Sequence, residues 1–317
     1  MNKSIVCTMV AALTSVTGMA QDFTFQDAQG KYLDVLQGGK KIARYMYAYD
    51  TKDKTTSQDT YKPYLHVFSD DGEMLITKGP GGAFTHHRGI FIGWNKLGFD
   101  GKVYDRWHMK GGEQIHQKFE KTEGGKESGV FTSVVNWNDS EKQAIVVEKR
   151  TMKFQPAEKP GYVLIDFTSE IQAPRGDVAL EGDQEHAGIQ YRPANEVDKS
   201  KTLYTYCGEK VDLKKDMDLA WIGETYTLSN KQYSVVMMNH PENPKGTRIS
   251  AYRDYGRFGM FPKTEVAKGA TKTFRYRFLI ATGVLPEASY IQKVCNAFTG
   301  RQDPVPSVTV FSSQAKK

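Results

Sequence analysis

Apolar and polar residues alternate over many short segments of this chain, and this pattern constrains the fold more than any other feature. Residues Tyr162–Gln172 show it clearly. There, Val163, Ile165 and Phe167 project to one side of an extended chain, and the polar residues between them project to the other. Similar alternation, or a β-branched run, predicts further strands at Tyr64–Phe68, Glu73–Thr77, Ile90–Trp94, Val130–Trp137, Ala144–Phe154, Gly188–Arg192, Tyr233–Asn239, Thr247–Arg253 and Lys272–Thr282.

Only one stretch has the spacing of an amphipathic helix. It opens at Pro286 and Glu287 and stops at Gly300. Because strands and helices do not alternate along the chain, the sequence predicts an all-β fold, a large antiparallel β-sandwich with one C-terminal helix. This number of long strands exceeds an immunoglobulin-like unit. By analogy, we therefore expect a supersandwich of the kind seen in sugar mutarotases.

The first twenty residues have the composition of a secretion signal. Lys3 supplies a positive charge, Ile5–Ala20 is mostly apolar and small, and Gly18 and Ala20 suit cleavage after Ala20. We therefore expect a periplasmic or secreted protein with a single domain over residues 21–303 and a loose tail over residues 304–317. No later stretch approaches the roughly twenty apolar residues of a membrane span.

The charge and cysteine content exclude several classes of protein. The net charge of +6 is spread along the chain without a basic stripe, so nucleic acid is not an expected partner. After the predicted cleavage only Cys207 and Cys295 remain, which is no disulfide framework. No glycine-rich nucleotide loop, serine nucleophile elbow or CxxC motif is present. These absences disfavour hydride, phosphoryl and thiol–disulfide chemistry.

Histidines are concentrated in polar segments between the predicted strands, where a rigid sandwich positions functional groups. Histidine and glutamate side chains in such segments can act as general acids and bases. The predicted catalytic residues are His86, His87, His108, Glu185, His186 and His240. The alternative is that these histidines are hydrogen-bonded structural residues at strand ends.

Arginine and tryptophan side chains near these histidines are candidates for substrate binding. An indole ring can stack on the apolar face of a sugar, and a guanidinium can bind hydroxyls or a carboxylate. The predicted substrate-binding residues are Arg88, Trp94, Trp107 and Arg192. Trp107 could equally be a core residue.

A metal site is a weaker prediction. Histidines from several loops, together with Glu185, could bind zinc or another divalent ion. No two histidines, however, have the HxH or HxxxH spacing of a local metal site. The sequence therefore assigns no metal ligands and leaves a divalent metal cofactor as an alternative.

The ordered set of these motifs resembles a bacterial family labelled "methane oxygenase PmoA". The motifs run in this order: Pro63-Tyr64-Leu65-His66, His86-His87-Arg88-Gly89, Trp107-His108, Glu185-His186-Ala187-Gly188, His240-Pro241-Glu242-Asn243-Pro244 and Tyr255-Gly256. At Ala187 the chain departs from a pattern in which many members carry glycine. The label itself does not fit, because the methane monooxygenase subunit is an integral membrane protein. The resemblance implies a β-sandwich protein, often encoded among genes for carbohydrate breakdown.

Three functional hypotheses follow. The first is an exported enzyme that uses histidine and glutamate acid–base chemistry on a sugar or oligosaccharide, as a lyase, epimerase or hydrolase. The second is a non-catalytic glycan-binding protein that uses the same aromatic residues. The third is a histidine-ligated metalloprotein of unknown chemistry. Convergence of the histidines in space would favour the first or the third hypothesis over the second.

Overall fold

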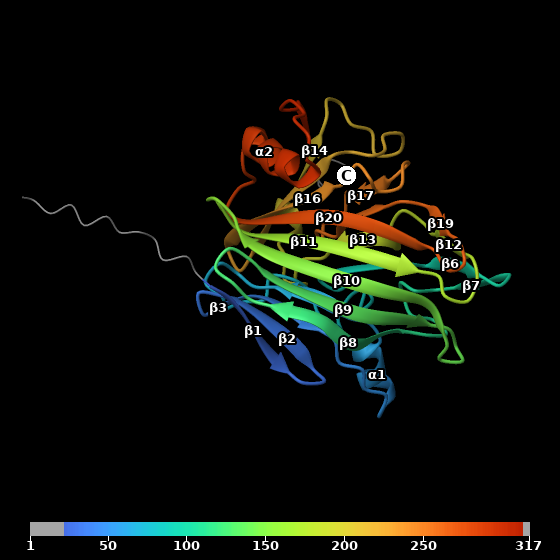
Figure 1. The fold of residues 1–317 in the computed structure, drawn as a ribbon. Helices are drawn as coiled ribbons and strands as arrows, with labels where there is room; N and C mark the ends of the chain where they lie inside the picture. The colour runs from blue at the N-terminus through green and yellow to red at the C-terminus, as the bar shows by residue number, and fades with distance from the viewer. Residues whose placement is uncertain (1–21, 313–317) are drawn as a thin grey trace, which may run out of the picture.

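Two large antiparallel sheets dominate the computed structural model, which describes residues 22–312 (Figure 1). The eight-stranded sheet contains, in spatial order, β1 (Phe23–Ala28), β2 (Tyr32–Gln37), β3 (Lys40–Met46), β4 (Tyr64–Val67), β5 (Ile90–Trp94), β13 (Ala187–Tyr191), β18 (Phe258–Phe261) and β17 (Arg248–Ala251). The nine-stranded sheet contains β21 (Val308–Ser312), β14 (Leu203–Cys207), β15 (Trp221–Leu228), β16 (Lys231–Asn239), β20 (Thr271–Thr282), β11 (Gly161–Gln172), β10 (Ala144–Pro156), β9 (Gly129–Asn138) and β8 (Gln114–Glu123).

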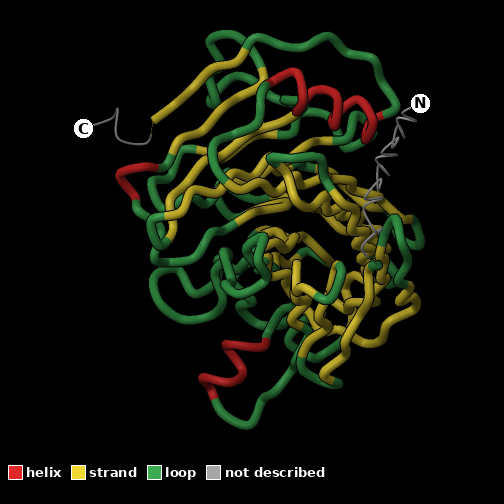
Figure 2. Tube along the Cα trace, turned by 90° about the vertical axis from the view of Figure 1, so that its left-hand side faces the viewer, coloured by secondary structure: helices red, strands yellow, loops and turns green. Residues whose placement is uncertain are grey.

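A smaller sheet and three short helices complete the described fold. The four-stranded sheet has the order β19 (Thr264–Val266), β12 (Val178–Glu181), β6 (Lys96–Phe99) and β7 (Lys102–Tyr104). The helices are α1 (Lys54–Thr60), the 3-10 turn η1 (Lys199–Lys201) and α2 (Ala288–Thr299), and they lie at the periphery of the strands (Figure 2). The predicted C-terminal helix is confirmed, and α1 is an addition that the sequence did not predict.

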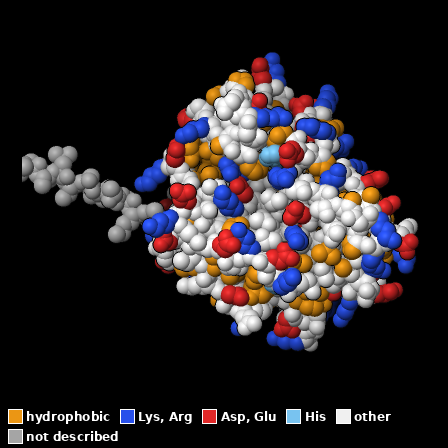
Figure 3. Space-filling model, viewed as in Figure 1, with side chains coloured by type: hydrophobic (Ala, Val, Ile, Leu, Met, Phe, Trp, Pro, Cys, Tyr) orange, Lys and Arg blue, Asp and Glu red, His pale blue; other side chains and the backbone are white. Residues whose placement is uncertain are grey.

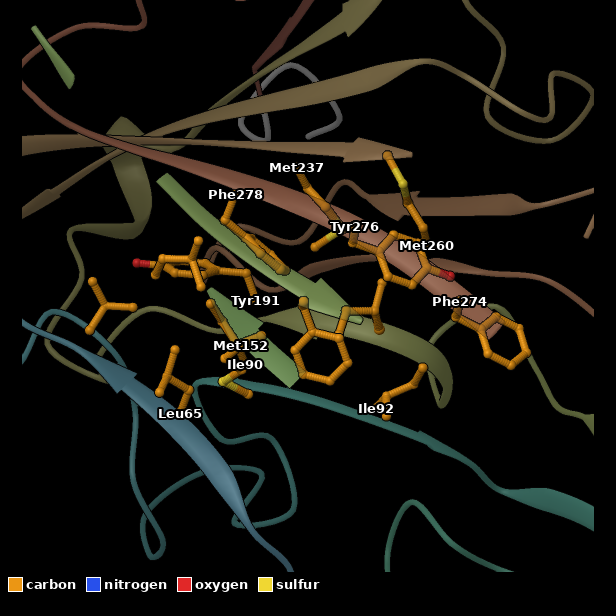
Figure 4. Packing of buried hydrophobic residues seen from close by; sticks show 14 of the residues in the cluster. Leu65, Ile90, Ile92, Met152, Tyr191, Met237, Met260, Phe274, Tyr276 and Phe278 are labelled. Atoms are coloured by element: carbon orange, nitrogen blue, oxygen red, sulfur yellow. The ribbon is translucent and has the colours of Figure 1, made fainter. Parts of the chain in front are cut away.

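The main core lies between the two large sheets. Tyr45 of the eight-stranded sheet contacts Phe131 of the nine-stranded sheet, with ring centroids 5.0 Å apart. Phe274 of β20 lies 5.3 Å from Trp94 of β5 by the same measure. Figure 4 shows side chains from both sheets interleaved in this layer. The predicted antiparallel sandwich is therefore confirmed, because alternate residues of each strand meet in one apolar layer.

Helix α2 packs on the outer face of the nine-stranded sheet, over β15, β16 and β20. Trp221, Met238 and Leu279 pack there against Ile291 and Cys295 of the helix. Gly300 ends the helix in a left-handed conformation, with φ of 71°. Cys295 and Cys207 are both free thiols.

The prediction of a loose tail over residues 304–317 is wrong for Val308–Ser312. These residues form β21 and pair with β14 at the edge of the nine-stranded sheet. The predicted strand Glu73–Thr77 is also wrong, because only isolated bridges form there. The other nine predicted strands are present, with small shifts at their ends. The predicted signal peptide lies outside the described residues.

The surface carries charges of both signs. On the face shown in Figure 3, lysine and arginine side chains are interspersed with aspartate and glutamate side chains. No helix within residues 22–312 is long and apolar enough to cross a membrane.

The outer face of the eight-stranded sheet carries a small second cluster around β5. Ile90 and Ile92 point into the main core, whereas Phe91 points outward and packs with Trp107. Gly93 lets a loop approach this face closely, since a Cβ atom there would lie 2.2 Å from the carbonyl oxygen of Arg106. The segment that contains His108 is thereby held against β5.

Candidate metal centre

Three histidines from three separate segments meet over the outer face of the eight-stranded sheet. His86 precedes β5, His108 follows β7, and His186 directly precedes β13. Each offers one ring nitrogen, and these three atoms lie within 4.8 Å of one another. The ring centroids of His86 and His108 are 4.3 Å apart, and those of His108 and His186 are 4.8 Å apart. Because β5 and β13 are neighbouring strands, the sheet itself brings two of these segments together.

His108 is held by a turn that Asp105 organises. One carboxylate oxygen of Asp105 accepts the backbone N–H groups of Trp107, at 3.0 Å, and His108, at 2.8 Å. The other oxygen lies 2.9 Å from His108 Nδ1. Because Nδ1 is occupied by this bond, Nε2 is the nitrogen left to face the cluster.

His186 is held by the same device. Asp183 accepts the backbone N–H of Glu185 at 2.9 Å, and the same carboxylate oxygen lies 2.8 Å from His186 Nδ1. Its second oxygen accepts a bond from Asn95 at 2.6 Å. Both segments therefore have the sequence Asp-x-x-His, with the aspartate bonded to its own turn and to the imidazole.

His86 presents a free nitrogen to the same space. Its Nε2 is buried and has no hydrogen-bond partner among residues 22–312. Burial, followed by the nearby charge of His108, lowers the pKa of His86 to about 3. The ring is therefore neutral at neutral pH and keeps a lone pair available.

Lys62 bonds to the backbone of the two segments that carry His86 and His108. Its ammonium donates to the carbonyl oxygens of His86 and Trp107, both at 2.7 Å, and lies 3.5 Å from the centroid of the Phe91 ring. Burial, followed by the charge of Arg88, lowers the pKa of Lys62 well below its ordinary value. This buried side chain joins the His86 segment to the His108 segment.

His87 lies behind the three histidines rather than among them. Its side chain is buried, and neither ring nitrogen has a hydrogen-bond partner among the described residues. Its ring centroid is 4.3 Å from that of His86 and 5.8 Å from that of His186. Burial, followed by the charge of Arg257, holds the pKa of His87 well below its ordinary value.

Glu185 connects the His186 turn to the loop between β17 and β18. Its carboxylate accepts hydrogen bonds from the Tyr252 hydroxyl and from the guanidinium of Arg253. Burial alone would raise the pKa of Glu185, but these bonds outweigh it and bring the pKa below its ordinary value. Glu185 is therefore an ionised carboxylate in an ion pair, adjacent to the histidines.

The arrangement has the chemistry of a metal site. Neutral imidazoles are good ligands for zinc and related transition-metal ions, and three of them leave coordination positions open for water or substrate. Carboxylates that hold the second ring nitrogen of a ligating histidine are a common feature of such sites. Hydrogen bonds from their turns outweigh burial and hold the pKa values of Asp105 and Asp183 below the ordinary range, so both carboxylates are charged.

Several residues that the sequence predicted for the site lie elsewhere. His240 contacts Phe298 of α2, with ring centroids 5.1 Å apart, and lies 3.8 Å from Glu242. Trp94 and Trp107 are fully buried, so neither offers a ring face to a substrate.

Arg88 and Arg192 are also buried, and they bond to the backbone of loops. Arg88 donates to the carbonyl oxygens of Gln58, Asp59 and Thr85. The guanidinium of Arg192 donates to the carbonyl oxygens of Pro193 and Tyr255. These buried arginines support the loops around the site.

Two aromatic residues beside the histidines were not among the predicted site residues, although one of them belongs to the Tyr255-Gly256 motif noted in the sequence. Phe84 and Tyr255 are in mutual contact, with centroids 5.1 Å apart, and Phe84 also lies 5.6 Å from His87. The sequence signal that could have found the metal-binding pattern is the repeated Asp-x-x-His at Asp105 and Asp183.

Comparison with solved structures gives distant similarities. A heparan sulfate lyase HepC mutant from Pedobacter heparinus aligns with a TM-score of 0.44 and 10% identity over 84% of this chain, which spans only 38% of that protein. A galactose mutarotase-like protein from Lactobacillus casei aligns over 82% of this chain and all of its own length, with a TM-score of 0.36 and 9% identity. Galactose 1-epimerase from Lactobacillus acidophilus aligns over 82% of this chain and 94% of its own, with a TM-score of 0.33 and 7% identity. Similarities this weak say nothing about activity.

Comparison by sequence is more decisive. No curated protein matches the chain. A family of unknown function, DUF6807, matches residues 32–296. Its description does not carry the PmoA label that the sequence resemblance suggested. Because the match covers most of the chain and includes His86, His108 and His186, this protein belongs to the DUF6807 family.

Proposed function

We propose that His86, His108 and His186 bind one divalent transition-metal ion, and that this ion is the catalytic centre of an exported enzyme acting on a sugar or oligosaccharide. The convergence of the three ring nitrogens within 4.8 Å carries the proposal. A non-catalytic glycan-binding protein would not require this convergence.

The donor set favours zinc or a similar ion. Tetrahedral zinc has Zn–N bonds of about 2.0–2.1 Å, which corresponds to nitrogens roughly 3.3 Å apart. The three nitrogens lie within 4.8 Å of one another, so binding would require them to move closer together. Asp105 and Asp183 then fix the tautomer in which Nδ1 carries the proton and Nε2 binds the ion.

The proposed reaction uses the ion as a Lewis acid. An ion held by three neutral histidines retains its positive charge, so it can lower the pKa of bound water to about 7 or polarise a substrate oxygen. Glu185 is ion-paired with Arg253, so it is not free to act as the general acid, and a water held by the ion would supply the proton instead. Hydrolysis and elimination are both compatible with this assignment.

Metal analysis tests the centre directly. Freshly purified protein is expected to contain about one transition-metal ion per chain by mass spectrometry, and His108→Ala is expected to lose it. The matched control is His240→Ala, because His240 is a partly buried histidine that lies against α2 and away from the cluster. Wild-type protein that contains no metal and does not bind added Zn²⁺ in a titration would overturn the proposal.

Activity and location have separate tests. Incubation with a panel of plant and host glycans should release product with the wild-type enzyme and with His240→Ala, and not with His108→Ala. Equal activity in His108→Ala would remove the metal centre from the reaction. N-terminal sequencing of the protein purified from its native host should give a chain that begins at Gln21, whereas retention of Met1 would contradict export.

A further inference from the structure

An exposed aromatic residue stands in a costly backbone conformation beside the histidines. Phe84 has φ of 54°, in the left-handed region that bulky residues rarely adopt. Its side chain is nevertheless 48% exposed, so burial of the ring does not account for the conformation. Residues held in such conformations often have functional roles, because the surrounding structure must enforce them.

The turn that carries Phe84 is fixed by surrounding side chains. The carbonyl oxygen of Phe84 accepts the backbone N–H of His87 at 2.8 Å. Lys78 donates to the carbonyl oxygens of Gly79 and Gly81, at 2.8 and 2.6 Å. These bonds hold the backbone of the turn that carries Phe84.

The partners of the ring place it at the metal centre. Phe84 lies 5.1 Å from Tyr255 and 5.6 Å from His87, with interplanar angles near 30°. Its centroid is also 6.3 Å from that of the ligand His86. Tyr255 also contacts Arg192, whose guanidinium carbon lies 4.8 Å from the centroid of the Tyr255 ring. A flat group resting on Phe84 would therefore lie near His86, one of the three proposed ligands.

The polar side chains near Tyr255 suit a ligand rich in hydroxyl groups. Glu185 and Arg253 form an ion pair in the same region, and the charges of both affect the pKa of Tyr255. This pair is neutral by itself, but the guanidinium groups of Arg257 and Arg192 also act on Tyr255, so the region around the ring is net positive. The pair offers both hydrogen-bond acceptors and donors, which sugar hydroxyls can use.

We propose that Phe84, supported by Tyr255, is the platform on which a pyranose ring of the substrate stacks beside the metal centre. This inference rests on the proposed function, and it assigns to Phe84 the role that the sequence assigned to Trp94 and Trp107. Aromatic rings bind the apolar face of a sugar, while groups at their edge bind its hydroxyls.

Saturation-transfer NMR tests the platform with four probes, the methyl glycopyranosides of glucose, galactose, mannose and xylose. We expect at least one probe to bind the wild-type metal-loaded protein. Phe84→Ala should weaken binding of that probe by tenfold or more, and Phe84→Tyr should restore it. The control Phe25→Ala removes a phenylalanine on β1, in the strand at the edge of the eight-stranded sheet, and should leave binding unchanged.

Metal content and melting temperature separate the possible failures. Phe84→Ala should keep its metal, and Phe84→Gly should melt no lower than Phe84→Ala because glycine relieves the left-handed strain. If Phe84→Ala loses metal, the residue supports the metal-binding turn and the platform role is wrong. If the wild type holds metal but none of the four probes binds in a Phe84-dependent manner, the platform proposal fails and the metal centre stands. Wild-type protein without metal refutes the proposed function instead.

Discussion

Replacing Asp105 by asparagine separates its two roles in the proposed metal centre. In the wild type, one carboxylate oxygen caps the turn by accepting the N–H groups of Trp107 and His108, and the other binds His108 Nδ1 at 2.9 Å. Asparagine keeps an oxygen for the turn, so the backbone should retain its shape. It places an amide NH₂ group where the acceptor for Nδ1 stood. The imidazole then favours the tautomer with the proton on Nε2, which cannot bind a metal.

The expected loss of metal affinity follows from the hydrogen bond between Asp105 and His108 Nδ1. A hydrogen bond to a charged group contributes about 1.5–3 kcal/mol. At about 1.4 kcal/mol for each factor of ten, Asp105→Asn should weaken metal binding roughly 10- to 150-fold. This agrees with the 10- to 100-fold effects typical of residues that support metal ligands. Asp183→Asn should have a smaller effect, because the Asp183 side chain is 49% exposed and that of Asp105 only 17%.

Competition of the protein with a chromophoric chelator for Zn²⁺ measures these affinities. The matched control is Asp198→Asn, because Asp198 caps the η1 turn through Ser200 and forms its ion pair with Lys201, away from the histidines. The control should bind Zn²⁺ as the wild type does. An affinity of Asp105→Asn within about twofold of the wild type would refute the assignment of Nε2 as the ligand atom.

Three further changes test the structure around the site. Gly188→Ala should lower the free energy of unfolding in urea by roughly 2–4 kcal/mol, because φ is 72° and a Cβ atom would lie 2.2 Å from the Met260 carbonyl oxygen. The control is Gly81→Ala, where φ is similar but the surrounding space is open, and it should cost only about 1 kcal/mol. Lys62→Met leaves two buried carbonyl oxygens without a donor, at about 1–3 kcal/mol each, and should also weaken metal binding in the chelator assay. Burial raises the pKa of Glu224 well above its ordinary value, so the folded state keeps a proton that the unfolded state loses above about pH 4.3. The buried histidines with lowered pKa values act in the opposite sense below about pH 6.5, so the test is a difference between two proteins. The stability of the wild type relative to Glu224→Gln should fall as the pH rises from about 5 to 8, and parallel curves for the two proteins would contradict the buried neutral carboxyl.

Strands could be predicted from the sequence where one face of the strand is buried and the other is exposed to solvent. Strand β11 has this alternation along its whole length, and its prediction is confirmed. Strand β15 has no such signal, because it is buried on both faces and includes polar residues such as Glu224. Strand β21 is short and follows a polar segment, so its pairing with β14 depends on tertiary contacts that local pattern does not reveal.

The site was predictable as a set of residue types but not as a geometry. His86, His108 and His186 were all identified as functional candidates, yet their segments are far apart in sequence and only the strand order brings them together. His240 has an equally polar sequence context, but it follows a strand of the nine-stranded sheet and so lies apart from the others. Burial of Trp107 could not be distinguished from exposure, because an indole beside a histidine suits either environment.

The loops around the histidines are tied down by long basic side chains that bond to main-chain carbonyl groups. Lys62 and Arg88 act in this way, and both are buried. In such a site the loops lose their conformational entropy during folding, so ligand binding does not have to order them. If the proposed enzyme activity is correct, its turnover should depend little on solvent viscosity, since no loop would have to open or close around the substrate. Speed at this centre would be set by bond making and breaking.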